Sequence, residues 1–220
     1  MRHLAATIVA LAVALPASAQ TRERLPLFTA DLHAATVGLP QAEGWVPAVS
    51  ADTELPGRSW GFVGGANVYP FRLGVITFGF GASFATAKGK SESLTITSGS
   101  GETAKTTVTP VVHTGITSFI PQVSMNFGHK FGWSYLSAGL GRSKVSSSAD
   151  AVGTTPGIVM PEAWNQAINF GGGARWFMKP HLGASFDVRF VKLGSRSATE
   201  KLPAAKRTQM WTISAGISLQ

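Results

Sequence analysis

The sequence predicts an all-β protein, an eight-stranded antiparallel up-and-down transmembrane β-barrel. Three observations lead to this prediction. Many segments alternate apolar residues with small or polar ones, the connections between them alternate between short and long, and one face of the segments carries most of the bulky aromatics. Alternation with a period of two is the signature of a strand with two different faces. Only 14% of the 220 residues are charged, and no apolar run reaches the roughly 18 residues of a transmembrane helix.

The N-terminus has the features of a secretory signal. Arg2 supplies the positive charge, an apolar stretch runs from Leu4 to Leu15, and Ala17-Ser18-Ala19 fits the small-x-small cleavage rule. The apolar stretch is too short to span a bilayer as a helix. We therefore expect residues 1–19 to be a signal peptide and residues 20–220 to form one exported barrel domain.

The strand pattern is clearest near the C-terminus. In residues 182–190, Leu182, Phe186 and Phe190 share one face, while Gly183 and Asp187 share the other. The same alternation recurs along the chain, more weakly in the first and fifth segments. The eight predicted strands are residues 27–38, 60–68, 76–84, 119–127, 132–142, 168–178, 182–190 and 210–219, with residues 44–51 as an alternative for the first.

The lengths of the connections give independent information. Short and long connections alternate strictly, which places all tight turns at one end of the barrel and all long loops at the other. Outer-membrane barrels have this layout, with short periplasmic turns and long external loops. The predicted turns are near 69–72, 128–130 and 178–181, and the predicted long loops are about 40–58, 88–112, 143–163 and 194–207.

Side-chain volume indicates which face points outward. An eight-stranded barrel has an interior just wide enough for side chains to fill, so an aromatic-rich face fits poorly inside it. We therefore expect the aromatic face to meet lipid, with a soluble carrier barrel as the alternative. Six aromatics beside the short turns are expected to form an interfacial girdle: Tyr69, Phe71, Phe131, Trp133, Trp176 and Phe177.

Two hairpins carry a family resemblance. The glycine-rich segment from Asn169 to Phe177, the turn at Pro180-His181 and the following strand resemble the penultimate hairpin of outer-membrane protein A-like and opacity-type barrels. The segment from Gln122 to Arg142 is similar to the central hairpin of the same family. The resemblance implies outer-membrane lipid as the surroundings and the barrel-assembly machinery as a partner during biogenesis. It says little about activity.

A few charges fall on the face predicted to line the lumen. Asp31, Arg175, Asp187 and Arg189 are candidates for an interior ion-pair network, and His33 shares that face. Buried charges need partners, so such a network would fill and close the barrel. A polar gate or narrow conduit is the functional alternative.

The sequence offers no convincing catalytic, cofactor or metal site. His181 and Ser185 are roughly 13 Å apart along a strand, and the compact His-x-Ser-Asn signature of outer-membrane lipid A deacylases is missing. The histidines are scattered without metal-ligand spacing, and cysteine is absent. We expect no enzymatic activity.

The last long loop is strongly basic. Its candidate cations are opposed by Glu200 alone, and they suit the phosphates of lipopolysaccharide. The chain has a net charge of +8, but the scattered basic residues and the predicted export argue against nucleic acid as a partner. The candidate lipopolysaccharide-contact residues are Lys192, Arg196, Lys201, Lys206 and Arg207.

These observations predict a monomeric outer-membrane protein with a non-enzymatic envelope role, namely structure, adhesion or surface interaction through its external loops. A narrow channel for ions or small solutes is the second hypothesis. An exported soluble carrier and a lipid-modifying enzyme are the more distant ones.

Overall fold

The computed structural model describes residues 24–50, 52–98, 105–200 and 202–220, so the predicted signal peptide lies outside the described residues. No helix in this part of the chain is long and apolar enough to cross a membrane. The strands are β1 (Phe28–Gly38), β2 (Arg58–Leu73), β3 (Ile76–Lys90), β4 (Thr95–Ser98), β5 (Lys105–Val108), β6 (Val112–His129), β7 (Gly132–Ala149), β8 (Ile158–Val159), β9 (Trp164–Lys179), β10 (Leu182–Leu193) and β11 (Thr208–Leu219).

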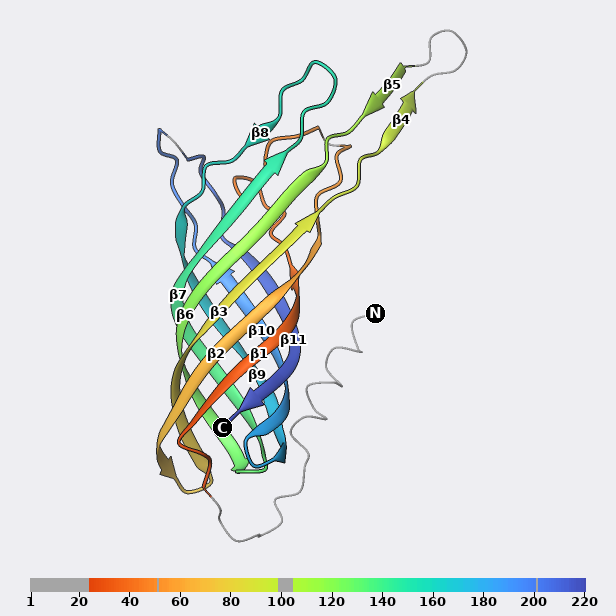
Figure 1. Cartoon of the computed structure of the whole chain (residues 1–220). Coiled ribbons are helices and arrows are strands. Elements are labelled where there is room, and N and C mark those ends of the chain that lie inside the picture. Colours follow the sequence, from red (N-terminus) through yellow and green to blue (C-terminus); the bar gives the residue numbers. More distant parts are fainter. Residues whose placement is uncertain (1–23, 51, 99–104, 201) are drawn as a thin grey trace, which may run out of the picture.

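Eight of these strands close into a barrel (Figure 1). Each long strand pairs antiparallel with the next along the chain, in the order β1, β2, β3, β6, β7, β9, β10 and β11. Pairing of β1 with β11 closes the ring. The predicted eight-stranded up-and-down barrel is therefore confirmed, and each of the eight predicted segments lies within or largely overlaps one barrel strand.

The two ends of the barrel differ as the connection lengths predict. The short turns lie at the lower end of Figure 1 and the long connections at the upper end. The backbone N–H of Gln220 donates to the carbonyl oxygen of His181 at 3.4 Å, which places the C-terminus beside the turn between β9 and β10. We call these the turn end and the loop end.

Two boundary predictions were wrong. The first turn is not at 69–72, because β2 continues past a register shift between Val68 and Phe71 and turns at Gly74, whose φ of +61° favours glycine. Proline at position 70 fits such an irregular site, because it has no N–H to donate to the ladder. Of the alternative first strand, residues 44–51, the described part (44–50) is loop in the structure, and residue 51 lies outside the described residues.

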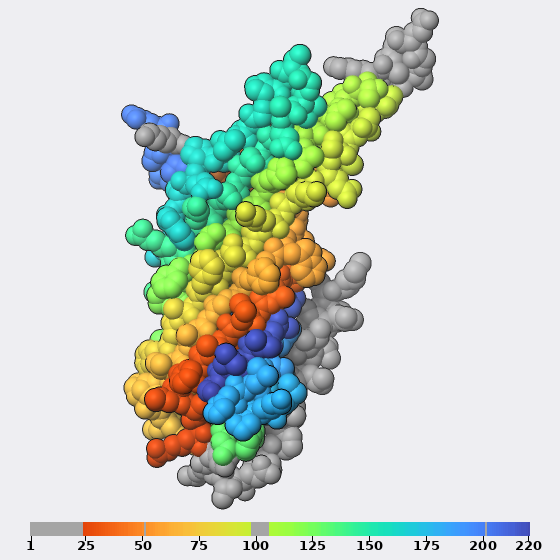
Figure 2. Space-filling model, in the orientation of Figure 1, coloured from red at the N-terminus to blue at the C-terminus, as the bar shows by residue number. Residues whose placement is uncertain are grey.

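The predicted long loops contain additional strand structure. β3, β6 and β7 continue beyond the predicted segments, and the connection after β3 carries a separate ribbon of β4 and β5. The short β8 pairs with the loop end of β7. Figure 2 shows two arms rising from the loop end of the barrel wall, one with the β4–β5 ribbon and one with β8. Much of the long connections is thus ordered by strand pairing.

Candidate functional site

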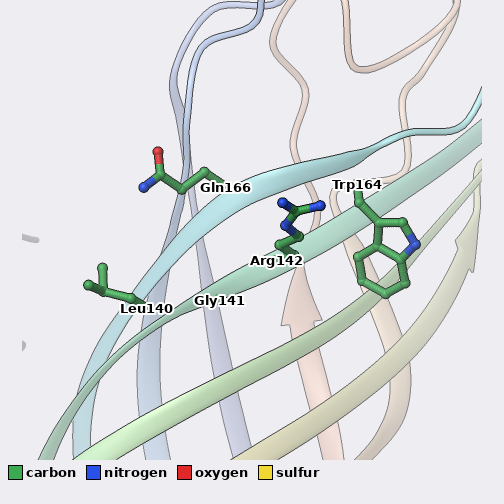
Figure 3. Close-up of a pocket in the computed structure, with 5 residues that line it drawn as sticks. All are labelled: Leu140, Gly141, Arg142, Trp164 and Gln166. Carbon is green, nitrogen blue, oxygen red and sulfur yellow. The ribbon is translucent and has the colours of Figure 1, made fainter.

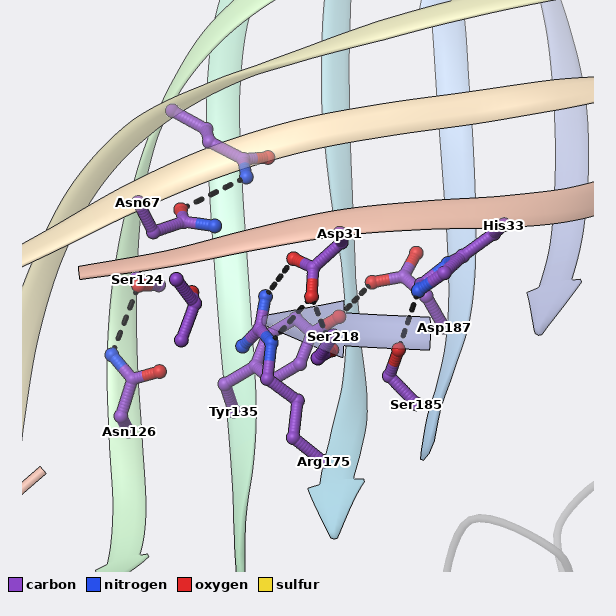
Figure 4. Close-up of polar contacts among 12 residues, drawn as sticks. Asp31, His33, Asn67, Ser124, Asn126, Tyr135, Arg175, Ser185, Asp187 and Ser218 are labelled. Carbon is purple, nitrogen blue, oxygen red and sulfur yellow. Dashed lines mark hydrogen bonds and ion pairs between the residues drawn. The ribbon is translucent and has the colours of Figure 1, made fainter. Parts of the chain in front are cut away.

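The centre of the lumen holds a network of paired charges (Figure 4). Arg175 of β9 reaches Asp31 of β1, with Nε donating to Oδ1 at 3.0 Å and Nη2 donating to Oδ2 at 2.5 Å. Ser218 of β11 donates to the same carboxylate. The Arg175 and Asp31 side chains are only 2% and 9% exposed, so this pair depends on its partners for the solvation that water would otherwise supply.

A second charged pair lies beside the first. Arg189 donates to Asp187 from Nε at 2.6 Å and from Nη2 at 2.9 Å, and both residues belong to β10. The hydroxyl of Tyr135 on β7 also donates to Asp187, and Arg189 donates to Gln122 on β6. The Arg175 guanidinium lies over the ring of Tyr135, 4.2 Å from its centroid, and so connects the two pairs.

The network ties together most of the barrel wall. Gln122 extends it to Asn67 of β2 through a hydrogen bond of 3.3 Å. Side chains from seven of the eight barrel strands therefore contribute, with β3 as the exception. The four candidate lumen residues lie close together, and the sequence had not indicated which acid meets which base.

His33 occupies the same layer. Its Nε2 is 2.6 Å from the Ser185 hydroxyl and its Nδ1 is 3.0 Å from the Ser214 hydroxyl. A histidine beside a serine is the arrangement of a base and a nucleophile. Here, however, both side chains are buried, and the adjoining cavity of about 10 Å³ has room for roughly one water molecule. The arrangement fits interior hydrogen bonding and leaves no space for a substrate.

An aromatic layer closes the turn end of the lumen. Trp133 and Phe177 stack with centroids 5.2 Å apart, and Tyr69 meets Trp133 edge-on at 6.0 Å. The Tyr69 hydroxyl is 2.8 Å from that of Thr29. We call Tyr69, Trp133, Tyr135 and Phe177 the aromatic plug, and all four are buried.

The prediction that six aromatics form an interfacial girdle was wrong for three of them. Tyr69, Trp133 and Phe177 point inward, whereas Phe71, Phe131 and Trp176 are exposed. Neighbouring residues on a strand face opposite sides, so Trp176 and Phe177 cannot both meet lipid. The turn end therefore divides its aromatics between an outer rim and an inner plug.

An apolar layer closes the loop end. It contains inward side chains of the barrel strands, which share their faces with the polar lumen residues below them. Trp45, from the connection between β1 and β2, is buried against this layer with 2% exposure. Its main members are Val37, Leu39, Val63, Ile116, Ile120, Val145, Val191, Leu193 and Met210. The lumen is thus filled by an aromatic, a charged and an apolar layer.

The basic residues of the last loop do not form one cluster. Arg196 packs over Trp45 at 5.1 Å from the ring centroid and donates to the carbonyl oxygens of Gly44 and Pro203, so it fastens the loop to its neighbour. Lys206 is exposed and lies 3.7 Å from Glu43. Arg207 is exposed, Lys192 lies on the outer wall of β10, and Lys201 lies outside the described residues.

The outer wall is apolar over most of its height. From Trp60 to Phe71, the outward residues of a strand tilted by about 40° rise roughly 25 to 30 Å, close to the apolar band of membrane barrels. The exposed side chains of this wall include Leu32, Trp60, Phe62, Phe71, Phe80, Phe84, Phe119, Val123, Leu136, Leu140, Ile168, Trp176, Phe186, Phe190, Ile213 and Ile217. So large an apolar surface is not expected on a monomer in water.

The chain has the fold of the small outer-membrane β-barrels. Its closed eight-stranded ring, polar-cored interior and apolar outer wall decide this point. No model of a known protein family matches the chain, and no curated protein is similar to it in sequence.

Three solved structures are similar to this barrel at the level of the fold. Neisserial surface protein A (NspA) has a TM-score of 0.48 and 15% identity, over 88% of this chain and 97% of that one. The outer membrane protease OmpT from Escherichia coli has a TM-score of 0.47 and 8% identity, over 74% of this chain and 64% of that one. The outer membrane protein OprG from Pseudomonas aeruginosa has a TM-score of 0.44 and 12% identity, over 90% and 97%.

The described residues contain no group of three or more His, Asp or Glu side chains suited to a metal ion. The interior charges are paired with one another, and the space they leave is small. The side chains of the lumen therefore hold the barrel rigid. The surfaces that a partner can reach are the outer wall and the loops.

Proposed function

We propose that the protein is a non-enzymatic, non-conducting outer-membrane anchor that presents its long loops at the cell surface for envelope structure, adhesion or other surface contacts. The observation that carries the proposal is the filled lumen beneath ordered loops. A barrel built for transport needs a path through its axis, and a catalytic barrel needs a cleft that admits substrate. The three layers of the lumen favour neither.

The loop end supports a role in surface contact. The connections after β3 and β7 are stiffened by strand pairing, which reduces the conformational entropy lost when a partner binds. The β4–β5 ribbon stands apart from the barrel and presents threonine-rich strands, with Thr95, Thr97, Thr106 and Thr107 among them (Figure 1). Surface loops on a rigid scaffold are where binding residues concentrate.

The basic loop contributes a candidate lipid contact. Lys206 and Arg207 are exposed at the loop end, and Lys192 faces outward on the wall. We infer that these cations contact lipopolysaccharide phosphates, with Lys201 as a further candidate and Arg196 holding the loop. Replacing all five residues with alanine is expected to reduce the lipopolysaccharide that co-purifies with the protein, and an unchanged amount would contradict the contact.

A conductance measurement distinguishes a non-conducting anchor from a channel. The purified full chain inserted into planar lipid bilayers is expected to give no steady single-channel current, because residues at both ends and the centre of the lumen are packed. Reproducible openings whose conductance increases when Trp133 or Arg189 is replaced with alanine would overturn the non-conducting assignment, because the current would then pass through the lumen.

Cell adherence tests the surface role. Bacteria that display the full chain are compared with bacteria whose residues 92–109 are replaced by a two-residue turn, on plates coated with an extracellular matrix preparation. We expect the shortened variant to adhere several-fold less while retaining the gel shift on boiling that marks a folded membrane barrel. Equal adherence of the two strains, and of cells lacking the protein, would contradict an adhesive role.

A further inference from the structure

We propose that two copies of the chain pair edge to edge through β4 and so join barrels in two facing membranes. In this contact, β4 of a second copy is added to the free edge of the β4–β5 ribbon. The proposal rests on the surface role proposed above and deepens it, because it names the partner that the ribbon binds.

The ribbon has a free edge along β4. Among the strands that the structure describes, β4 pairs with β5 alone. The backbone N–H of Thr109 donates to the carbonyl oxygen of Leu94 at 2.8 Å, which fixes the alternation of hydrogen bonds along the ribbon. By this alternation Ile96 bonds to β5, while the backbone N–H and C=O groups of Thr95 and Thr97 point away from β5. Both threonines are exposed, so these backbone groups are open to a further strand.

The ribbon also lacks the support and the protection that sheets usually have. A two-stranded ribbon is only marginally stable in water, and three or more strands are needed for independent stability. Natural edge strands are commonly protected by charges, prolines or bulges. The segment Thr95–Ser98 contains no charged residue and no proline, and its pairing with β5 has no register shift. The edge of β4 is therefore a site for strand addition.

The sequence of β4 matches a second copy of itself. A two-fold axis that relates two antiparallel strands aligns each strand with its own sequence in reverse, so a segment that reads the same in both directions suits such a pair. Thr95-Ile96-Thr97 has this property, whereas Lys105–Val108 of β5 does not. A pair centred on Ile96 aligns Thr95 with Thr97 of the second copy and aligns Ile96 with its own counterpart.

This register satisfies the open backbone groups. Thr95 and Thr97 each exchange backbone hydrogen bonds with their counterpart, and Ile96 occupies the non-hydrogen-bonded position, where opposite side chains lie closest together. Leu94 is 40% exposed and lies on the same face as Ile96, so it meets the second copy's Ile96 diagonally. The pair thus combines backbone hydrogen bonds with a small apolar contact.

The direction of β4 determines how the two barrels face each other. Figure 1 shows the ribbon rising from the loop end, with β4 running away from the barrel. In an antiparallel pair the second β4 runs toward the first barrel, so the second barrel lies beyond the far end of the ribbon. Two copies in one flat membrane both rise from it, and their β4 strands cannot run in opposite directions. The contact therefore links two membranes.

The groove on the outer wall is a less suitable site for a protein partner. It lies on the outer face of β7 and β9 and has a volume of about 540 Å³. Leu140, which is 63% exposed, and Trp164 line it beside Arg142 (Figure 3). These side chains belong to the wall that faces lipid, so a protein in water does not reach them. The ribbon stands above this wall.

Cysteine cross-linking tests the register directly, because the chain contains no cysteine of its own. Residues opposite each other at a non-hydrogen-bonded position have Cα atoms roughly 4.5 Å apart, within the range of a disulfide. Ile96→Cys is therefore expected to give disulfide-linked dimers under mild oxidation. Thr107→Cys is the matched control, because Thr107 lies opposite Ile96 within the ribbon and its counterpart in the pair is three strand spacings of roughly 4.8 Å away.

The cross-linking is carried out between two populations of cells that display the full chain, each with a different epitope tag. Both cysteine variants must show the gel shift on boiling. After mixing and oxidation, we expect dimers that carry both tags to be at least tenfold more abundant for Ile96→Cys than for Thr107→Cys. Equal amounts from the two positions would overturn the proposed register. Dimers whose two tags are always alike would overturn the link between membranes.

Settling of cell suspensions measures the same contact without cysteine. Thr95→Lys combined with Thr97→Lys places like charges opposite each other in the pair, and Thr106→Lys combined with Val108→Lys adds the same charge to the same face of the ribbon on β5. We expect cells with the β4 variant to settle several-fold more slowly than cells with the unaltered chain or the β5 variant, because many ribbons act together between two cells. Equal settling of the two variants would overturn the assignment to β4.

The adherence test proposed above is independent of this one. Loss of matrix adherence on shortening residues 92–109, without dimers that carry both tags, would retain the surface role and overturn the self-pairing. Dimers that carry both tags, with unchanged matrix adherence, would support the self-pairing and contradict adhesion to the matrix.

Discussion

Arg175 and Asp31 meet across the barrel interior through two hydrogen bonds, although their strands β9 and β1 are not neighbours in the wall. The pair therefore acts as a cross-brace between two strands that are separated in the wall by β10 and β11. Replacing Asp31 with Asn leaves the guanidinium buried without its counter-charge. We expect Asp31→Asn to lower the free energy of unfolding by about 3–5 kcal/mol, measured by urea unfolding in lipid vesicles.

The paired replacement is the control for this prediction. Asp31→Leu combined with Arg175→Met removes both charges, and it is expected to be closer in stability to the unaltered protein than either single change. If the double variant were as unstable as the sum of its two single changes, the cross-brace would have no coupling energy.

Tyr135 connects the aromatic plug to the charged layer, since its ring belongs to the plug and its hydroxyl donates to Asp187. Tyr135→Phe keeps the ring and removes only the donor. Because the lost hydrogen bond is to a charged group, we expect the free energy of unfolding to fall by about 1.5–3 kcal/mol. Ser137→Ala is a suitable control on the same face of β7, because the Ser137 hydroxyl has no hydrogen-bond partner. A larger loss for Ser137→Ala than for Tyr135→Phe would contradict this account.

The sequence predicted the barrel well because membrane-spanning strands must alternate. Phe186, Asp187 and Val188 show it directly, with the charge inward and the apolar groups outward. The predictions were wrong where alternation is not required. The orientation of Tyr69, near the turn end of β2, was one such case, and the strand pairing within the long connections was another. The partners of Asp31 were also beyond sequence reasoning, since they depend on the stagger of strands around the ring.

The apolar layer of the lumen was missed for a similar reason. Val145 and Ser143 lie on the same inward face of β7, one within the apolar layer and the other bonded to Ser118. The alternation of apolar and polar residues indicates whether a side chain points into the lumen or outward. It does not indicate at which height along the barrel axis the side chain lies. Ile116 and Ile120 on β6 gave one available signal, as large apolar residues on an otherwise polar face, and Val191 and Leu193 on β10 gave another.

Trp45 and Arg196 fasten two of the long connections to each other. The Trp45 indole N–H donates to the carbonyl oxygen of Lys206 at 2.7 Å, and Arg196 covers the indole ring. Trp45→Ala removes both contacts from the loops but leaves the strand ladder intact. We expect trypsin to cleave after Lys206 or Arg207 several-fold faster in this variant, with the gel shift on boiling unchanged. Trp164→Ala on the outer wall is the control, and an equal increase in cleavage there would argue against a specific fastening.

Two inward glycines distinguish the crowded from the open parts of the lumen. A Cβ added at Gly173 would lie 2.8 Å from the Tyr135 hydroxyl and 2.1 Å from the carbonyl oxygen of Phe186, whereas one at Gly65 would meet nothing closer than 3.4 Å. Gly173→Ala is therefore expected to displace Tyr135 from Asp187 and to cost about 1–3 kcal/mol of stability, as overpacking does. Gly65→Ala, which borders the small cavity, is expected to stay within about 0.5 kcal/mol of the unaltered protein or to gain slightly from reduced freedom of the unfolded chain. Urea unfolding of both variants in lipid vesicles provides the comparison, and equal stabilities would show that the space around Tyr135 does not limit the packing of the lumen.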